Sequence, residues 1–227
     1  MKSKLTILAA LTAALLASQE RFDFKVRSYF FAGLAGDTAA LAKGMAICED
    51  ILAKDPQQPE ALVWHGMGIM LGSRDAFQKG DQQTGMTLWQ RGLKEMNDAA
   101  ALAPEDLGVR IVRGAVFLTA SRQLPDPTMA HQLIAAGLSD FEKAYEVQGP
   151  DLSRLGTHPR GELMIGLADA YSRLGNQEKA QAWFERIQKE LPRTPYEKSA
   201  ATWLETKSLA PAQAGCLGCH TATEATK

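Results

Sequence analysis

Apolar residues recur along the chain at the three- and four-residue spacing of amphipathic α-helices. In four segments a small residue precedes such an apolar stripe, and these residues are Gly44, Gly92, Gly137 and Ala180. A second kind of helix lies between consecutive segments, over 62–71, 109–118 and 164–174, and it is also centred on a small residue. This alternation predicts an all-α fold of stacked helical hairpins, because one hairpin cannot bury its apolar faces alone.

The repeat is irregular in length, and a further helix follows it. The intervals between Gly44, Gly92, Gly137 and Ala180 are 48, 45 and 43 residues by subtraction, so we expect insertions in the loops. Over 194–209, one helical face carries apolar residues at i, i+4, i+7 and i+8, which are Tyr196, Ala200, Trp203 and Leu204. We expect this segment to be a capping helix on the end of the stack.

The last hairpin has a recognisable pattern of residue types. Its order and its length from about 161 to 192 resemble the tetratricopeptide repeat, through Leu167, Ala168, Tyr171, Gly175, Ala180, Phe184 and Pro192. The resemblance implies a tetratricopeptide-like solenoid over 19–193, with a groove that holds a peptide or helix of a protein partner. Gly66 and Gly114 stand where the last repeat has Ala168, so the helices should cross more closely there.

The N-terminus has the features of a secretory signal peptide. Lys2 and Lys4 precede an apolar run over 5–16, and Ala17 provides a small residue for cleavage. This predicts a signal peptide over 1–18 and a periplasmic mature protein. The run is shorter than the roughly 20 residues of a membrane span, and no second run follows, so we expect no membrane span in the mature chain.

Composition, net charge and the absence of catalytic motifs argue against several classes of function. The 227 residues are 45% hydrophobic and 22% charged, which is typical of a globular protein. The formal net charge is -1 and the basic residues are dispersed, so nucleic acid is not expected as a partner. Three cysteines cannot form a structural disulfide framework. The chain shows no nucleophile elbow, phosphate-binding glycine loop or HExxH motif, and we therefore expect it not to be an enzyme.

The segment 210–227 is expected to be a linker and tail, and it contains the strongest chemical motif. Cys216, Cys219 and His220 form the CxxCH sequence of c-type haem attachment. The two thiols can add to the two vinyl groups of one haem, and the imidazole can become an axial ligand of its iron. The alternatives are an incidental thiol pair, a disulfide, half of a zinc site, or thiol or peroxidase chemistry.

The resemblance to c-type cytochromes ends at this motif. Only the seven residues 221–227 follow His220, so the tail cannot enclose a haem by itself. The haem must therefore be exposed, pack against the solenoid, or be covered by another protein. Candidates for a second axial ligand are His158, His131, His65 and Met164. Each histidine also has a structural interpretation: a solvated turn for His158, a helix surface for His131, and an internal hydrogen bond for His65.

These observations predict an exported tetratricopeptide-like scaffold with one covalent haem c on its tail. We expect it to serve in electron transfer with a redox partner, or in haem-dependent assembly with a periplasmic protein. The alternative is a protein-interaction scaffold without haem, similar to the repeat domains that assist cytochrome c maturation. The third cysteine, Cys48, lies in a helical stripe and is expected to be an inert buried thiol.

Overall fold

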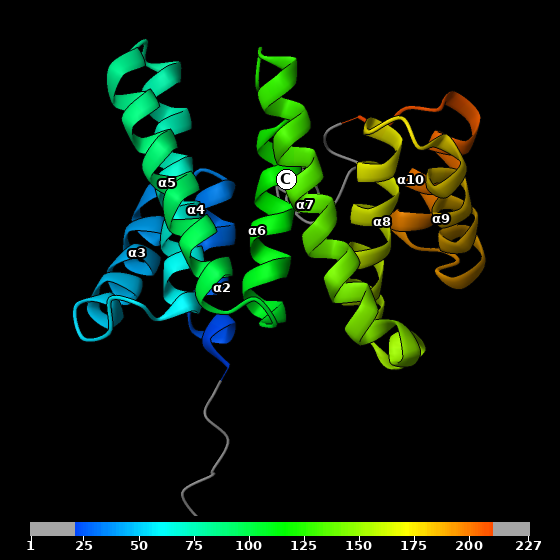
Figure 1. Ribbon diagram of the computed structural model, residues 1–227, viewed down its shortest axis with the longest axis horizontal. Helices are drawn as coiled ribbons and strands as arrows, with labels where there is room; N and C mark the ends of the chain where they lie inside the picture. Colours follow the sequence, from blue (N-terminus) through cyan, green and yellow to red (C-terminus); the bar gives the residue numbers. More distant parts are fainter. Residues whose placement is uncertain (1–20, 211–227) are drawn as a thin grey trace, which may run out of the picture.

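The structure is a computed structural model, which describes residues 21–210. The predicted signal peptide and the motif of Cys216, Cys219 and His220 lie outside the described residues. The described part contains nine α-helices, one 3₁₀ helix and no strand (Figure 1). The elements are α2 (Phe22–Leu34), α3 (Thr38–Leu52), α4 (Pro59–Gln78), α5 (Gln82–Leu102), α6 (Leu107–Ala120), α7 (Pro127–Gln148), η2 (Gly149–Arg154), α8 (Thr157–Arg173), α9 (Gln177–Glu190) and α10 (Pro195–Thr206).

The helices pack mostly as antiparallel pairs that follow the chain order, and the prediction of an all-α fold is confirmed. The pairs are α2 with α3, α4 with α5, α6 with α7, and α8 with α9, while α10 packs on α9 and α8. Figure 1 shows the pairs side by side along the long axis of the molecule. Four pairs therefore correspond to the four segments that the apolar pattern indicated.

Small residues lie where the paired helices cross, as predicted. A Cβ atom at Gly92 would lie 2.8 Å from the carbonyl oxygen of Gly66, and one at Gly137 would lie 3.1 Å from that of Gly114. Such distances are tighter than ordinary van der Waals contact, so only glycine permits this approach of the two backbones. The close crossing expected from Gly66 and Gly114 is thus confirmed.

Turn and cap residues set the ends of the helices. Asp37, Asp81 and Asp126 precede helices, and each side-chain carboxylate accepts a hydrogen bond from a backbone N–H of the first turn. Gly175 has φ of +83° in the turn between α8 and α9, a conformation that favours glycine. The turn that the sequence assigned to Gly175 is therefore present.

The expectation that insertions lie in the loops is wrong in part. Extra residues also lengthen the helices, since α4, α5 and α7 have 20, 21 and 22 residues, whereas α9 has 14. In Figure 1 the α4–α5 hairpin and the start of α7 extend beyond the rest of the stack at its upper edge. An insertion that keeps helical periodicity continues the intrahelical hydrogen bonds, so it lengthens the helix instead of forming a loop.

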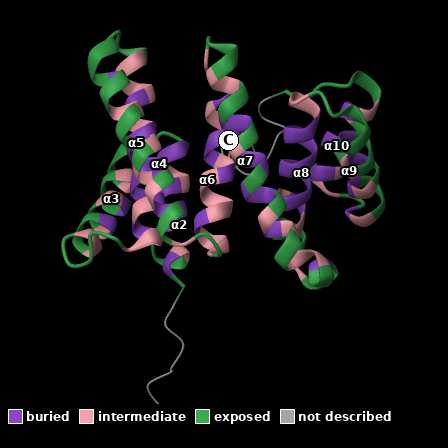
Figure 2. Cartoon of the chain, in the orientation of Figure 1, coloured by how far each residue is buried: buried purple, intermediate pink, exposed green. Residues whose placement is uncertain are grey.

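Two hydrophobic clusters form the core, one built around α2 to α6 and the other mainly from α7 to α10, with Leu118 of α6 in the second cluster. Figure 2 shows the buried residues on the facing sides of the helices. In α10, Trp203 is stacked on Phe184 with ring centroids 4.4 Å apart, and its indole Nε1 donates to Ser172 Oγ at 2.8 Å. The apolar face predicted for this helix is therefore the face that packs.

A buried ion pair group joins α6 and α7. The carboxylate of Asp140 is fully buried, and it accepts from Arg113 Nε and Arg113 Nη2, each at 2.7 Å, and from Arg110 Nη1 at 2.8 Å. A buried carboxylate requires this degree of compensation, because removing the charge from water is costly. The network therefore ties the two helices in one register.

Candidate functional site

The candidate haem-binding residues Cys216, Cys219 and His220 lie outside the described residues. Among the residues that the structure does describe, no group of three or more His, Cys, Asp or Glu side chains could hold a metal ion. Within residues 21–210, the remaining components of a candidate site are the four possible second ligands of the haem iron and the cavities of the helical body.

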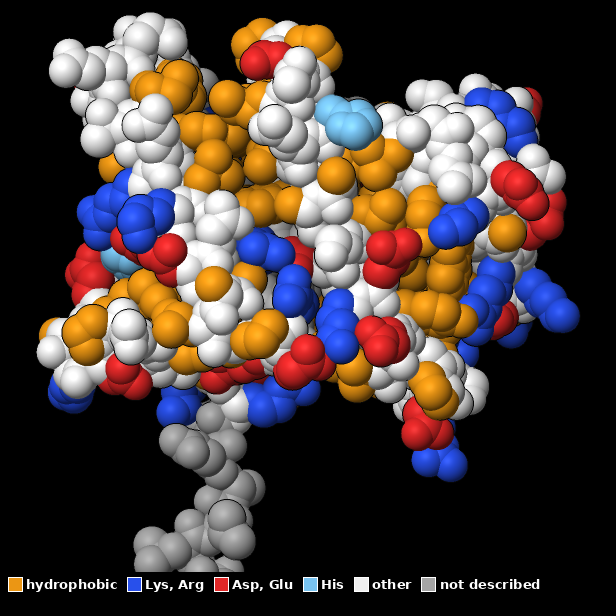
Figure 3. Space-filling view, in the orientation of Figure 1, with side chains coloured by type: hydrophobic (Ala, Val, Ile, Leu, Met, Phe, Trp, Pro, Cys, Tyr) orange, Lys and Arg blue, Asp and Glu red, His pale blue; other side chains and the backbone are white. Residues whose placement is uncertain are grey.

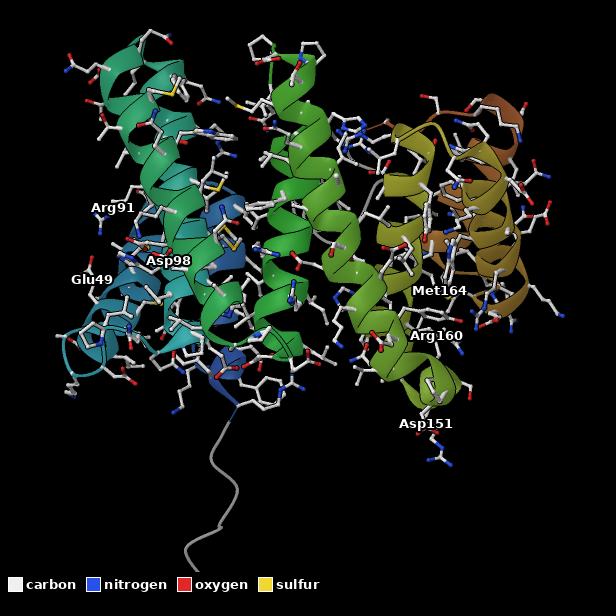
Figure 4. The ribbon with its side chains drawn as sticks, in the orientation of Figure 1. Glu49, Arg91, Asp98, Asp151, Arg160 and Met164 are labelled. Atoms are coloured by element: carbon white, nitrogen blue, oxygen red, sulfur yellow. The ribbon has the colours of Figure 1, made fainter. Side chains whose placement is uncertain are left out.

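His65 is held in an internal hydrogen bond, as expected. Its ring is buried on α4, with Nδ1 2.6 Å from Glu95 Oε2 and Nε2 3.6 Å from Glu49 Oε1. Arg91 Nε donates to Glu95 Oε1 at 3.0 Å, and Figure 4 shows Arg91 and Glu49 at the outer side of the molecule, near α5 and α3. Burial alone raises the pKa of Glu95, but the hydrogen bonds and charges of His65 and Arg91 together lower it below its ordinary value.

The other three candidates lie on two helices, α7 and α8, and in different surroundings. Met164 is fully buried in the core on α8 (Figure 4). His131 is exposed on α7, which agrees with its interpretation as a surface residue. His158 lies in the first turn of α8, with Nδ1 3.0 Å from the hydroxyl of Tyr196 on α10. The structure thus packs Met164 in the core and gives His65 and the exposed His158 hydrogen bonds within the fold.

Cys48 is buried on α3 and unpaired. Burial, together with the nearby charges of Glu49 and Glu95, raises the pKa of its thiol to about 12. A thiol in this state does not form the thiolate that reacts or binds metal near neutral pH. The prediction of an inert buried thiol agrees with this environment.

One cavity of the helical body is a groove between the α4–α5 and α6–α7 hairpins, with a volume of about 460 Å³. We call it the methionine groove, and the sequence did not predict it. Four of the eight methionines line it, Met67 and Met70 from α4, Met86 from α5 and Met129 from α7. Met67 and Met70 lie one turn apart in the middle of α4, whereas Met86 and Met129 belong to other helices, and the packing of the hairpins brings all four together. The number of methionines in the sequence could have suggested a methionine-rich surface, but it could not have located the groove.

The groove combines an apolar interior with one cation. Phe77 and Trp89 contribute aromatic rings, and the residues that line the groove include Arg74 but no carboxylate. Arg74 Nε is buried and has no hydrogen-bond partner among the described residues, although it lies 3.6 Å from Asp75 Oδ1. Burying a polar N–H without a partner costs free energy. The groove is therefore suited to an apolar ligand that also carries an acceptor or a negative charge.

A second cavity, of about 400 Å³, lies between α7, α8 and α9 and has a different character. The hydroxyl of Tyr171 donates to Glu142, and burial followed by this contact raises the tyrosine pKa. Lys179 lies 4.8 Å from the centre of the Tyr171 ring. Tyr171 is thus engaged with both Glu142 and Lys179.

Comparisons with known protein families, curated proteins and solved structures found no match. Between residues 21 and 210, no helix is both long enough and apolar enough to cross a membrane.

Proposed function

We propose that this chain is an exported helical-repeat protein that carries one covalent haem c on its C-terminal tail. The observation that carries the proposal is the CxxCH motif of Cys216, Cys219 and His220. It follows an N-terminal segment with the features of a secretory signal, and export is a condition for attachment of this cofactor. The chain contains one cysteine besides the motif, Cys48, which the helical core buries.

The attachment chemistry balances without a further reagent. Each thiol would add across one vinyl double bond, with the sulfur on the carbon next to the porphyrin ring and the hydrogen on the terminal carbon. Cys216 and Cys219 would hold the group in this way, and the imidazole of His220 would be a ligand of its iron. The bound haem supplies one-electron redox chemistry. We propose that this serves electron transfer with a redox partner, or haem-dependent assembly with a periplasmic protein.

We also propose that the helical pairs form a tetratricopeptide-like solenoid with α10 as its cap. Support comes from the small residues at the helix crossings, from the positive φ of Gly175 and from the burial of Tyr171 and Phe184 at the positions of the repeat pattern. Trp203 of α10 covers Phe184 at the end of the stack. The lengths of α4, α5 and α7 distinguish this chain from regular repeats.

The direct test is expression of the full chain in a host that matures c-type cytochromes, followed by haem staining of a denaturing gel. We expect a stained band for the wild-type protein, since thioether bonds survive denaturation. The Cys216→Ser/Cys219→Ser variant should accumulate without the band. Cys48→Ala is the matched control, because it removes the remaining cysteine and should keep the band. An unstained wild-type protein in such a host would exclude covalent haem.

A second candidate is a scaffold that binds a partner and carries no haem. The methionine groove favours it, since methionine-rich apolar surfaces adapt to varied partners. A haem-free wild-type protein that still binds a periplasmic partner after deletion of 211–227 would support this alternative. A stained wild-type band would exclude it.

A further inference from the structure

The methionine groove changes in character from one end to the other. Three exposed glutamines lie at one end, near the junction of α4 with α5 and beyond the end of α6, and they are Gln78, Gln82 and Gln123. At the other end the lining side chains are at most 9% exposed, and they are Leu34, Met67, Met70 and Val116. Figure 3 shows hydrophobic side chains exposed between the upper parts of α5 and α7, where the surface is hollowed. A ligand that matches this groove has one polar end and one apolar end.

Arg74 lies between the two ends of the groove, and it is the one charged residue among those that line it. It follows Met70 by four residues on α4 and precedes Gln78 by four residues, so the three side chains share one face of the helix. The groove therefore carries a positive charge where its polar and apolar ends meet. The polar end of a matching ligand is an anion.

The guanidinium of Arg74 has a hydrogen-bond donor that the fold does not use. Arg74 Nε has no hydrogen-bond partner among the described residues, and the 3.6 Å to Asp75 Oδ1 is too long for a hydrogen bond. Asp75 is 41% exposed, and such a surface ion pair contributes little. The side chain of Arg74 is 34% exposed, so a ligand in the groove can contact it. A carboxylate is the matching anion, because it accepts two parallel hydrogen bonds from a guanidinium.

The dimensions of the groove limit the apolar part of the ligand. Met67 and Arg74 are seven residues apart on α4, which is about 10 Å along the helix axis. Three bonds of an extended chain span about 3.8 Å, so about eight bonds cover this distance. A protein helix is the alternative occupant, but two turns of a helix about 10 Å wide have a volume of roughly 850 Å³. The groove has about 460 Å³, so it favours a slender chain.

We propose that the methionine groove binds a linear aliphatic carboxylate of about eight to ten carbons, with its carboxylate on Arg74 and its chain directed toward Met67. The flexible side chains of Met67 and Met70 can adapt to such a chain, and the volume of the groove is in the usual range for small-molecule sites. The proposal goes beyond the proposed function, because this binding does not require a haem.

Isothermal titration calorimetry on the mature full-length chain tests the proposal, with octanoate as the probe and octanol as its neutral counterpart. The wild-type protein and the haem-free Cys216→Ser/Cys219→Ser variant are both titrated. We expect one site per chain and at least about tenfold tighter binding of octanoate, because octanol lacks the charge that strengthens its hydrogen bond to Arg74. From hexanoate to decanoate the affinity should rise by up to about fourfold for each methylene, and dodecanoate should gain little more.

Two substitutions on α4 and at its end locate the carboxylate. Arg74→Gln should bind octanoate and octanol with similar affinity, because the charged partner of the carboxylate is removed. Lys79→Gln is the matched control, since Lys79 is exposed at the C-cap of α4 and does not line the groove. It removes the same charge and should change the affinity for octanoate by less than about fivefold. Circular dichroism should show the same helical content for both variants.

The outcomes separate this proposal from the proposed function. Haem staining is read independently, so covalent haem can be refuted while octanoate still binds, and the reverse. Absence of octanoate and decanoate binding by the haem-free variant would overturn the proposal. Binding of an acidic amphipathic helical peptide in their place, lost in Arg74→Gln, would assign the groove to a protein partner. A preference for octanoate over octanol that persists in Arg74→Gln would also overturn it.

Discussion

The closest helix crossing can be tested by adding one methyl group. A Cβ atom at Gly92 would lie 2.8 Å from the carbonyl oxygen of Gly66 and 3.2 Å from the backbone nitrogen of Met70, where ordinary contact begins at 3.4 Å. Backbone atoms cannot rotate away, so α4 and α5 must separate. Gly72→Ala is the matched control, since its Cβ would lie 3.7 Å from Leu88 Cδ1 in ordinary contact.

The difference in stability between Gly92→Ala and Gly72→Ala measures the cost of crowding at the helix crossing. Both substitutions gain the same helix propensity, about 1 kcal/mol relative to glycine, and this gain cancels in the difference. Overpacking of a tight contact costs about 1 to 3 kcal/mol. We therefore expect Gly92→Ala to be less stable than Gly72→Ala by about 1 to 3 kcal/mol, which is roughly 2 to 12 °C in melting temperature for a protein of this size.

Unfolding in urea, followed by far-ultraviolet circular dichroism on the mature chain, measures this difference. Thermal melts provide an independent value. Equal stabilities of Gly92→Ala and Gly72→Ala would refute the argument that these two backbones are in contact, and with it the structural reason for the small residues of the repeat.

The buried ion pairs, the buried thiol and the N-terminus provide three further tests. Asp140→Ala leaves two arginines without their shared buried partner and should lower the unfolding free energy by about 3 to 5 kcal/mol, whereas Asp98→Ala at an exposed pair should change it by less than about 1 kcal/mol. Burial raises the pKa of Cys48 from 9.0 to about 12. The contribution of this thiol to the unfolding free energy is therefore complete below pH 9 and should be lost as the pH rises toward 12, as measured by unfolding at each pH. At mildly alkaline pH the thiol of Cys48 should also resist thiol reagents until the protein unfolds, as measured in the Cys216→Ser/Cys219→Ser variant. Intact mass of the periplasmic protein should place the mature N-terminus shortly after Ala17, and a full-length mass would contradict the signal peptide.

Much of the secondary structure and the pairing of helices could be predicted from local patterns. The stripes around Gly44, Gly92, Gly137 and Ala180 became second helices of pairs, because helical periodicity determines which side chains share a face. The predicted ends of the helices were less accurate. The apolar stripe over 62–71, for example, lies within a helix that continues to Gln78. Polar residues continue a helix without marking it in the apolar pattern, so the extension was missed.

The candidate site also has one part that the local sequence predicted and another part that it did not. The CxxCH motif is local, since its two thiols and its imidazole lie within five residues, and it was found by spacing alone. A second ligand for the proposed haem would come from elsewhere in the chain. The four candidates chosen by residue type lie on three helices, and none of them lines the methionine groove.

Local sequence was sufficient for the helical class, the close crossings and the chemistry available at Cys216, Cys219 and His220, because each depends on residues near one another in the chain. Only the packed fold showed that a groove lies between the hairpins, that four methionines from three helices share it, and that Arg74 lies there with no hydrogen-bond partner for its Nε among the described residues. These features arise where separate hairpins meet. Their positions depend on the lengths and packing of whole helices, which no local pattern specifies.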